Sequence, residues 1–238
     1  MNINNGIKFL EKDKNRYVGF LECLKYDETE FLYAENDGVM FYDKTAGIYF
    51  LATSSEEACK KALDGIEKTE GVALCVNEYE YLALKNKFGY DGLNRCKQIV
   101  WEGKEPLPLK GICEVKRLEP TKENVEVVFN HYTLHYTREH IKYIMENLGI
   151  YGGYVNGEIV GFIGRHEEHS IGMLEVFPEF RRRGYAEEIE KSVLNILIAK
   201  GEIPYAHIID DNVPSLTMHK NMGYSFSKGS FYWLFYKN

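Results

Sequence analysis

The sequence predicts a mixed α/β protein in which helices cover both faces of a sheet. Helix-like and strand-like segments alternate along the second half of the chain, and an Asn156-Gly157 pair joins two strand-like runs there. Apolar residues make up 45% of the 238 residues, and 18 Tyr and 13 Phe supply bulky side chains for a core. Helices and strands of this kind each bury one face, so they stack in layers around a shared core.

Charge and composition exclude several classes of protein. Lys plus Arg number 29 against 36 for Asp plus Glu, a net charge of −7, whereas a general nucleic-acid-binding protein needs a basic surface. The acidic balance instead favours cationic partners such as amines. The five cysteines are scattered and form no C-x-x-C pair, so neither a zinc knuckle nor a disulfide framework is expected.

The sequence also bears on location and assembly. It contains neither an apolar signal segment at its start nor a run of about 18 apolar residues that would predict a membrane span. We therefore expect a cytoplasmic protein with reduced thiols and no membrane partner, present as a monomer or homodimer.

One break in composition divides the chain. Residues 102–111 read EGKEPLPLKG, and proline cannot continue a helix or a central strand. We expect a domain junction here, with an N-terminal lobe over residues 1–105 and a C-terminal lobe over residues 106–238.

Apolar periodicity predicts the elements of the N-terminal lobe. Ser54 or Ser55 can cap the first of its helices. The expected elements are a hairpin over 31–42, strands over 46–52 and 71–76, and helices over 55–66 and 78–87.

The C-terminal lobe is more clearly patterned. Thr137 can cap a helix that Gly149 ends, and Asn156-Gly157 accepts the positive φ angles of a tight hairpin. The three strands from residue 150 to residue 177 are expected to be antiparallel. The expected elements are strands over 112–118, 150–155, 158–164, 170–177, 203–209, 224–226 and 231–236, and helices over 121–135, 137–148, 185–200 and 212–221.

The strand, loop and helix from residue 170 to residue 200 carry the main chemical signal. Gly184 permits an unusual backbone torsion just before the helix, and Ala186 leaves room for a ligand. A helix N-terminus offers unpaired amides and partial positive charge, to which the arginines at 181–183 add. Together these features predict a binding site for an anion such as a pyrophosphate.

These residues resemble a known family. Arg181-x-x-Gly184-x-Ala186 matches the R/Q-x-x-G-x-G/A motif of the GNAT N-acetyltransferase superfamily. Asn212-x-x-Ser215, followed by HKNMGY at 219–224, resembles the N-x-x-S…Y-x-K-x-G-F segment of that superfamily. The resemblance covers residues 112–238, and LEVFPEFRRRGYA within a two-lobe chain is similar to the glycine N-acyltransferase-like, tandem-lobe branch.

The resemblance implies that acetyl-CoA is the co-substrate. It would lie in a V between the strands at 170–177 and 203–209, with its pantetheine arm on main-chain groups of the first strand and its pyrophosphate on the amides of the bend. The cofactor-binding residues implied are Val176, Phe177, Arg181, Arg182, Arg183, Gly184, Tyr185, Ala186, Asn212 and Ser215.

The catalytic residues are less clear. The position of the family's leaving-group acid, a tyrosine, is His219 here, which is either that acid or a surface histidine. The positions of the family's base are Ser170 and Gly172, and neither is a good base. Glu168 and Glu175 remain candidates, as do His169 and water, although strict alternation points Glu175 away from the face of Gly172.

Two further patterns complete the prediction. KNKFGY at 85–90 parallels HKNMGY, but Thr53-Ser54-Ser55-Glu56 lacks the glycine of a phosphate loop, so the N-terminal lobe is expected to be a degenerate GNAT-like copy that helps to shape the acceptor pocket. His131 and His135 have metal-ligand spacing but no evident third ligand, so no metal is expected.

The sequence therefore predicts an N-acetyltransferase that moves an acetyl group from CoA to a primary amine, a small molecule, by direct attack on the thioester. The alternatives are a protein or peptide N-acetyltransferase and a non-catalytic acyl-CoA-binding protein.

Overall fold

The structure is a computed structural model that describes residues 1–238 except 27, 68, 70, 133–135 and 238. It contains two compact units. The discontinuous unit comprises Met1–Val100 and His207–Asn238, and the central unit comprises Trp101–Ala206. In the described part of the chain, every helix is too short or too polar to cross a membrane.

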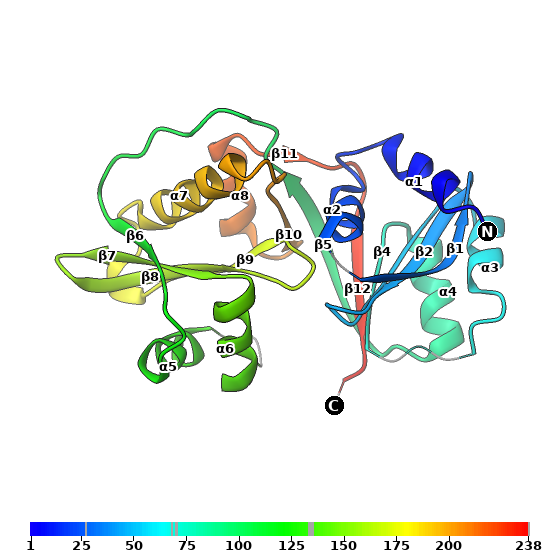
Figure 1. Ribbon diagram of the computed structural model, residues 1–238, viewed down its shortest axis with the longest axis horizontal. Helices are drawn as coiled ribbons and strands as arrows, with labels where there is room; N and C mark the ends of the chain where they lie inside the picture. Colours follow the sequence, from blue (N-terminus) through cyan, green and yellow to red (C-terminus); the bar gives the residue numbers. More distant parts are fainter. Residues whose placement is uncertain (27, 68, 70, 133–135, 238) are drawn as a thin grey trace. The chain divides into compact units, whose positions relative to one another are not determined.

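The discontinuous unit is built on an eight-stranded sheet of order β1-β2-β3-β4-β12-β5-β10, with β11 paired to β5 (Figure 1). The strands of that sheet are β1 (Thr29–Glu35), β2 (Gly38–Asp43), β3 (Ile48–Thr53), β4 (Val72–Cys75), β5 (Gly92–Val100), β10 (Tyr205–Ile209, whose first two residues belong to the central unit), β11 (Ser225–Phe226) and β12 (Phe231–Phe235). Its helices are α1 (Ile3–Glu11), α2 (Val18–Tyr26), α3 (Glu56–Leu63), α4 (Glu78–Phe88) and α8 (Val213–Met222).

The last strand of the chain completes the sheet of the first hundred residues. β12 pairs antiparallel with both β4 and β5, and Phe231 and Leu234 on it are fully buried. This pairing explains why the C-terminal segment belongs with the N-terminal one. The compact units thus differ from the predicted domains at 1–105 and 106–238 in the placement of residues 207–238.

A buried carboxylate closes the point where β3 and β4 end. The parallel pairing of the two strands runs to Leu51 opposite Cys75. Just beyond it, the Glu80 carboxylate accepts from the Thr53 amide at 2.5 Å and from the Val76 amide at 2.9 Å, so it bridges the two strand ends. Helix α4 thereby places its own acidic side chain beside the Thr53-Ser54-Ser55-Glu56 segment, where the sequence shows no phosphate-loop glycine.

The central unit contains a four-stranded antiparallel sheet of order β6-β7-β8-β9, with α5 and α6 on one face and α7 on the other (Figure 1). The predicted Asn156-Gly157 hairpin is present, with φ angles of 51° and 83°. The elements are β6 (Glu114–Arg117), α5 (Lys122–His131), α6 (Arg138–Asn147), β7 (Ile150–Val155), β8 (Glu158–Arg165), β9 (Ile171–Val176), the 3-10 helix η1 (Pro178–Phe180) and α7 (Tyr185–Ala199).

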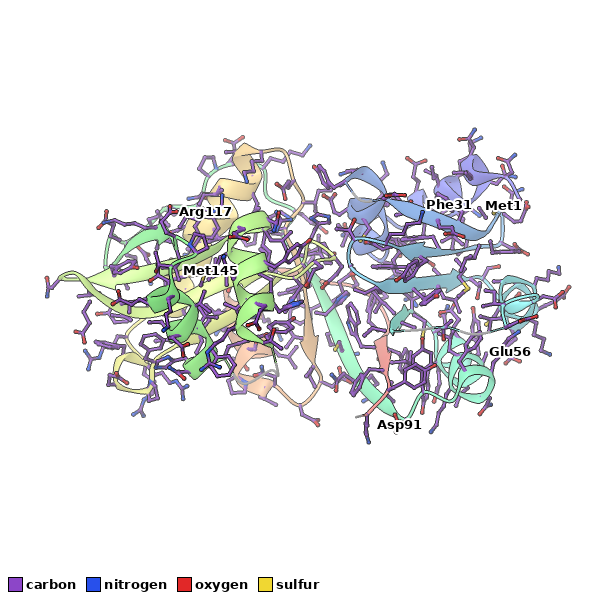
Figure 2. The ribbon with its side chains drawn as sticks, turned by 60° about the horizontal axis from the view of Figure 1, so that its bottom comes forward. Met1, Phe31, Glu56, Asp91, Arg117 and Met145 are labelled. Atoms are coloured by element: carbon purple, nitrogen blue, oxygen red, sulfur yellow. The ribbon has the colours of Figure 1, made fainter. Side chains whose placement is uncertain are left out.

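Polar contacts hold the helices and the connecting segment onto this unit. The Arg117 guanidinium on β6 donates to the carbonyl of Met145 on α6 at 3.0 Å, and Figure 2 labels both residues. The Asn195 side chain on α7 donates to the Leu107 carbonyl and accepts from its amide, at 3.0 and 2.7 Å. The Pro/Gly-rich segment is therefore bound along α7.

Candidate active site

Strand β9 is interrupted by a bulge. Gly172 lies opposite Gly164 and Glu175 lies opposite Phe162, so two residues of β9 face one residue of β8. Met173, inside the bulge, has a left-handed φ of 56°. Because the extra residue resets the alternation, Gly172 and Glu175 share one face of the sheet. The expectation that Glu175 points away from that face is wrong, since alternation alone does not reveal a bulge.

The chain from β9 to α7 bends at two left-handed residues. After η1, Arg182 has a φ of 61° and Gly184 a φ of 87°. Gly184 directly precedes α7, and a Cβ added to it would meet the Ile112 side chain at 3.3 Å. Glycine removes the steric cost of this conformation where the helix begins.

The amides of this bend point to a ligand-binding role. Among the residues that the structure describes, none of the amides from Arg182 to Ala186 donates to a carbonyl, whereas the Glu188 amide donates to the Gly184 carbonyl at 3.2 Å. The 15-residue helix α7 adds partial positive charge at the same end, and the three arginines are exposed. The bend therefore has the donors and the charge that bind an anion.

The acidic residues in the first turn of α7 are engaged elsewhere. The Glu188 carboxylate is buried and accepts from the amides of Lys110 and Gly111, at 3.0 and 2.5 Å. The Lys191 ammonium donates to Glu187 at 2.6 Å and lowers the pKa of the Glu187 carboxyl. These partners offset the negative charge that would otherwise weaken anion binding at the bend.

Two residues predicted for different roles are partners. The Arg181 guanidinium donates to the Glu175 carboxylate at 2.6 Å, and its Nε donates to the Val176 carbonyl at 2.8 Å. Arg181 thus binds the candidate base Glu175 and one main-chain group expected to meet the pantetheine arm.

Phe177 is part of the core of the central unit. Its amide donates to the Val160 carbonyl at 3.0 Å, and its ring stacks on His131 with 3.9 Å between centroids. Nδ1 of His131 lies 2.8 Å from the Val127 carbonyl, which gives that imidazole a structural role. His135 lies outside the described residues, and within them no group of three His, Cys, Asp or Glu side chains is placed to hold a metal.

The turn before β9 presents the remaining candidates. Glu168 is buried, and its carboxylate accepts from the Ser170 hydroxyl at 2.5 Å. The Tyr205 hydroxyl donates to the Glu168 carbonyl, and the Arg165 guanidinium donates to the His169 carbonyl at 3.0 Å. These bonds fix the turn but confine Glu168 within it.

The structure adds a pair that the sequence did not suggest. The Tyr136 hydroxyl lies 3.1 Å from Nδ1 of His166, and the Tyr136 ring stacks on His140 with 4.5 Å between centroids. His140 contacts the Glu167 carboxylate at 2.6 Å. Burial, reinforced by nearby carboxylates, raises the pKa of the Tyr136 phenol, which therefore stays protonated at neutral pH. Only tertiary structure brings these side chains together, so the sequence carries no signal for them.

The second motif lies in the discontinuous unit. The Asn212 side chain caps α8 by accepting from the Ser215 amide at 3.2 Å. His219 is 6% exposed, and its Nδ1 lies 2.7 Å from the Ser215 carbonyl, so it is not a surface histidine. The Tyr224 ring meets the His219 ring edge-on and is buried.

Comparisons with known proteins agree with this fold. Residues 147–234 match the family model described as FR47-like protein. A search of curated proteins finds no match to this chain.

Several solved structures are similar over almost the whole chain. An X-ray structure of a Drosophila protein has a TM-score of 0.72 at 15% identity, covering 99% of this chain and 97% of its own. A GCN5-related N-acetyltransferase from Kribbella flavida has a TM-score of 0.57 at 10% identity, with 94% and 96% covered. An acetyltransferase from the GNAT family of Colwellia psychrerythraea has a TM-score of 0.53 at 12% identity, with 100% and 98% covered. The chain therefore has the fold of the GNAT N-acetyltransferase superfamily, in agreement with the resemblance of its motifs to that superfamily.

Proposed function

We propose that this chain is an N-acetyltransferase that transfers an acetyl group from acetyl-CoA to a primary amine of a small molecule. The observation that carries the proposal is the bend from Arg182 to Ala186, whose amides have no main-chain acceptor among the described residues and which lies at the N-terminus of α7. Its donors and charge suit the pyrophosphate of CoA.

The roles of the other residues follow from their positions. Val176 ends the bulged strand and Phe177 follows it, and both would border the pantetheine arm. The amine would attack the thioester directly, and the departing thiolate would need a proton. His219 is the proposed donor of that proton, and Asn212 and Ser215 hold the helix turn that carries it.

The N-terminal segment fits a degenerate GNAT-like lobe without a CoA site. Glu80 bridges the ends of β3 and β4, and its negative charge is unfavourable to a phosphate there. In this proposal, residues 1–105 form the degenerate lobe and residues 106–238 form the active one.

Gly184→Glu tests the bend, because it places a carboxylate in front of the amides. Gly201→Glu is a matched control, since Gly201 lies just past the other end of α7 with a similar φ of 74° and nothing within 4 Å of an added Cβ. We expect calorimetric titration with CoA to show binding to the wild type and to Gly201→Glu but none to Gly184→Glu. Equal CoA affinity in all three proteins would refute the proposed cradle.

A second candidate is a non-catalytic acyl-CoA-binding protein. Two contacts favour this candidate. Nδ1 of the buried His219 lies beside the Ser215 carbonyl, and the Arg181 guanidinium binds the candidate base Glu175. Thiol release from acetyl-CoA with a panel of primary amines and N-terminal peptides distinguishes the alternatives. Release with small amines supports the proposal, release with peptides alone indicates a protein N-acetyltransferase, and CoA binding without release indicates a binding protein.

A further inference from the structure

Resting on the proposed function, we propose that His166 is the residue that removes the proton from the acceptor amine. No sequence motif contains it. It lies on the turn between β8 and β9, and its ring occupies the space that a side chain at Gly172 would fill. Gly172 is one of the two positions that match the family's base. The turn therefore places an imidazole where the strand itself has no basic side chain.

The His166 ring lies in the space that the missing side chain of Gly172 leaves. A Cβ added at that position would lie 2.0 Å from Nε2 and 2.4 Å from Cδ2 of His166. Two non-bonded atoms do not come this close, so any side chain at residue 172 would displace the imidazole. The next residue, Met173, begins the bulge of β9, so the ring lies beside the irregular part of the strand.

Contacts on several sides fix the turn that carries His166. The His166 amide donates to the Ser170 carbonyl at 3.0 Å, and the His169 amide donates to the His166 carbonyl at 2.9 Å. The neighbouring Arg165 is buried and forms an ion pair with Glu202 at 2.7 Å. The imidazole is therefore placed by the fold, while remaining partly exposed to solvent.

Tyr136 is the positioning residue for this imidazole. Its hydroxyl lies 3.1 Å from Nδ1 of His166, and its phenol stays protonated because burial raises its pKa. When the hydroxyl accepts from Nδ1–H, the lone pair of the neutral ring is on Nε2, and this is the form that can take a proton. The titratable groups on the elements around this pair are Tyr132, His140, Glu167, Glu168, His169 and Glu175.

The carboxylates in this set favour a cationic acceptor, which is the form of a primary amine before it reacts. The ammonium group gives one proton to Nε2 of His166 and becomes a neutral amine. Its nitrogen lone pair then forms the C–N bond with the thioester carbon, while the C–S bond breaks and its electron pair leaves on sulfur. The thiolate takes its proton from His219, and the second proton of the nitrogen passes to solvent and replaces the one that His219 gave. His166 releases the first proton to solvent, so one ammonium and one acetyl-CoA give one amide, one thiol and one proton.

Four variants test the assignment by thiol release with the amine panel and by calorimetric titration with CoA. His166→Gln removes the base, and we expect kcat/KM for the amine to fall about 10²-fold or more, with the CoA dissociation constant unchanged within about twofold. Gly172→Ala keeps the imidazole but displaces it, so a loss in the same direction is expected. His166→Ala should regain part of its rate when free imidazole is added. Tyr136→Phe should alter the acid limb of the pH profile of kcat/KM, a readout that a purely structural role would not change.

The outcomes separate this inference from the proposed function. A wild type that binds no CoA overturns the proposed function itself. A wild type that binds CoA and releases no thiol with any amine overturns the assignment of His166, as does a His166→Gln protein with the wild-type kcat/KM. A fall in kcat/KM in His169→Asn but not in His166→Gln would identify His169 as the base and would also overturn the assignment of His166.

Discussion

The Arg181 guanidinium binds the Glu175 carboxylate at 2.6 Å, across the corner between the end of β9 and the bend that leads into α7. Both residues were expected at the site, one for CoA and the other for proton transfer. Their pairing means that Glu175 already has a cationic partner and that Arg181 is held back against its own strand. Glu175 therefore acts on the charge of the bend rather than as a free base.

We predict that Glu175→Gln strengthens CoA binding two- to fivefold. The substitution removes one negative charge beside a bend that binds an anion and releases the Arg181 side chain, about half of which is exposed. Unfolding free energy should change by less than about 1 kcal/mol, as for other exposed ion pairs. Calorimetric titration with CoA at two salt concentrations measures the effect, which added salt should reduce.

Glu179→Gln is the matched control for this prediction. Glu179 is an exposed carboxylate in η1, and its carbonyl accepts from the Arg183 guanidinium at 2.9 Å. If Glu179→Gln gains as much CoA affinity as Glu175→Gln, then removing any negative charge near the bend is enough to strengthen binding. Weaker binding in Glu175→Gln would mean that the pair itself shapes the bend.

The bridge formed by Glu80 predicts a large cost for its amide isostere. The carboxylate accepts from three main-chain amides, those of Thr53, Val76 and Asn77, and from two side chains. In Glu80→Gln, a donating NH₂ replaces one accepting oxygen and faces these donors in a fully buried site. We expect the unfolding free energy to fall by about 2–4 kcal/mol, measured by denaturant unfolding.

Glu78→Gln provides the comparison, because Glu78 lies in the same first turn of α4 but is exposed. It should change the unfolding free energy by less than about 0.5 kcal/mol. Equal effects of the two substitutions would show that the bridge contributes nothing specific.

Local patterns in the sequence predicted the elements around the bend well. The positive φ of Asn156 and Gly157, the Thr137 cap and the left-handed Gly184 each follow from one or two adjacent residues. The helix predicted at 185–200 is α7 at Tyr185–Ala199. Such features depend on chemistry within a few residues, which a single sequence records.

Features that depend on distant residues were not predictable in the same way. The bulge at Met173 depends on how β9 pairs with β8, and the seat of His166 depends on a missing side chain six residues away. The place of β12 between β4 and β5 joins residues more than a hundred positions apart. The sequence identifies Gly172 and the last strand, but it does not show which residues they contact.

A last prediction concerns stability at alkaline pH. Burial raises the pKa of Tyr79 and of Tyr90 to about 12, compared with about 10 for tyrosine in an unfolded chain. The folded protein therefore binds these phenolic protons more tightly than the unfolded chain does. The stability that this provides is fully present below pH 10 and is lost as the pH rises from about 10 through about 12.

Ultraviolet titration of the phenolate band, in the native protein and in denaturant, measures the shift directly. The Tyr90 hydroxyl donates to Thr69 at 3.0 Å and its ring stacks on Tyr236, so Tyr90→Phe should keep the ring contact and remove one late-titrating phenol. The loss of unfolding free energy between pH 10 and pH 12 should be smaller in this variant than in the wild type. If every tyrosine of the native protein titrates together near pH 10, the burial of these two phenols does not act on their ionisation, and the prediction fails.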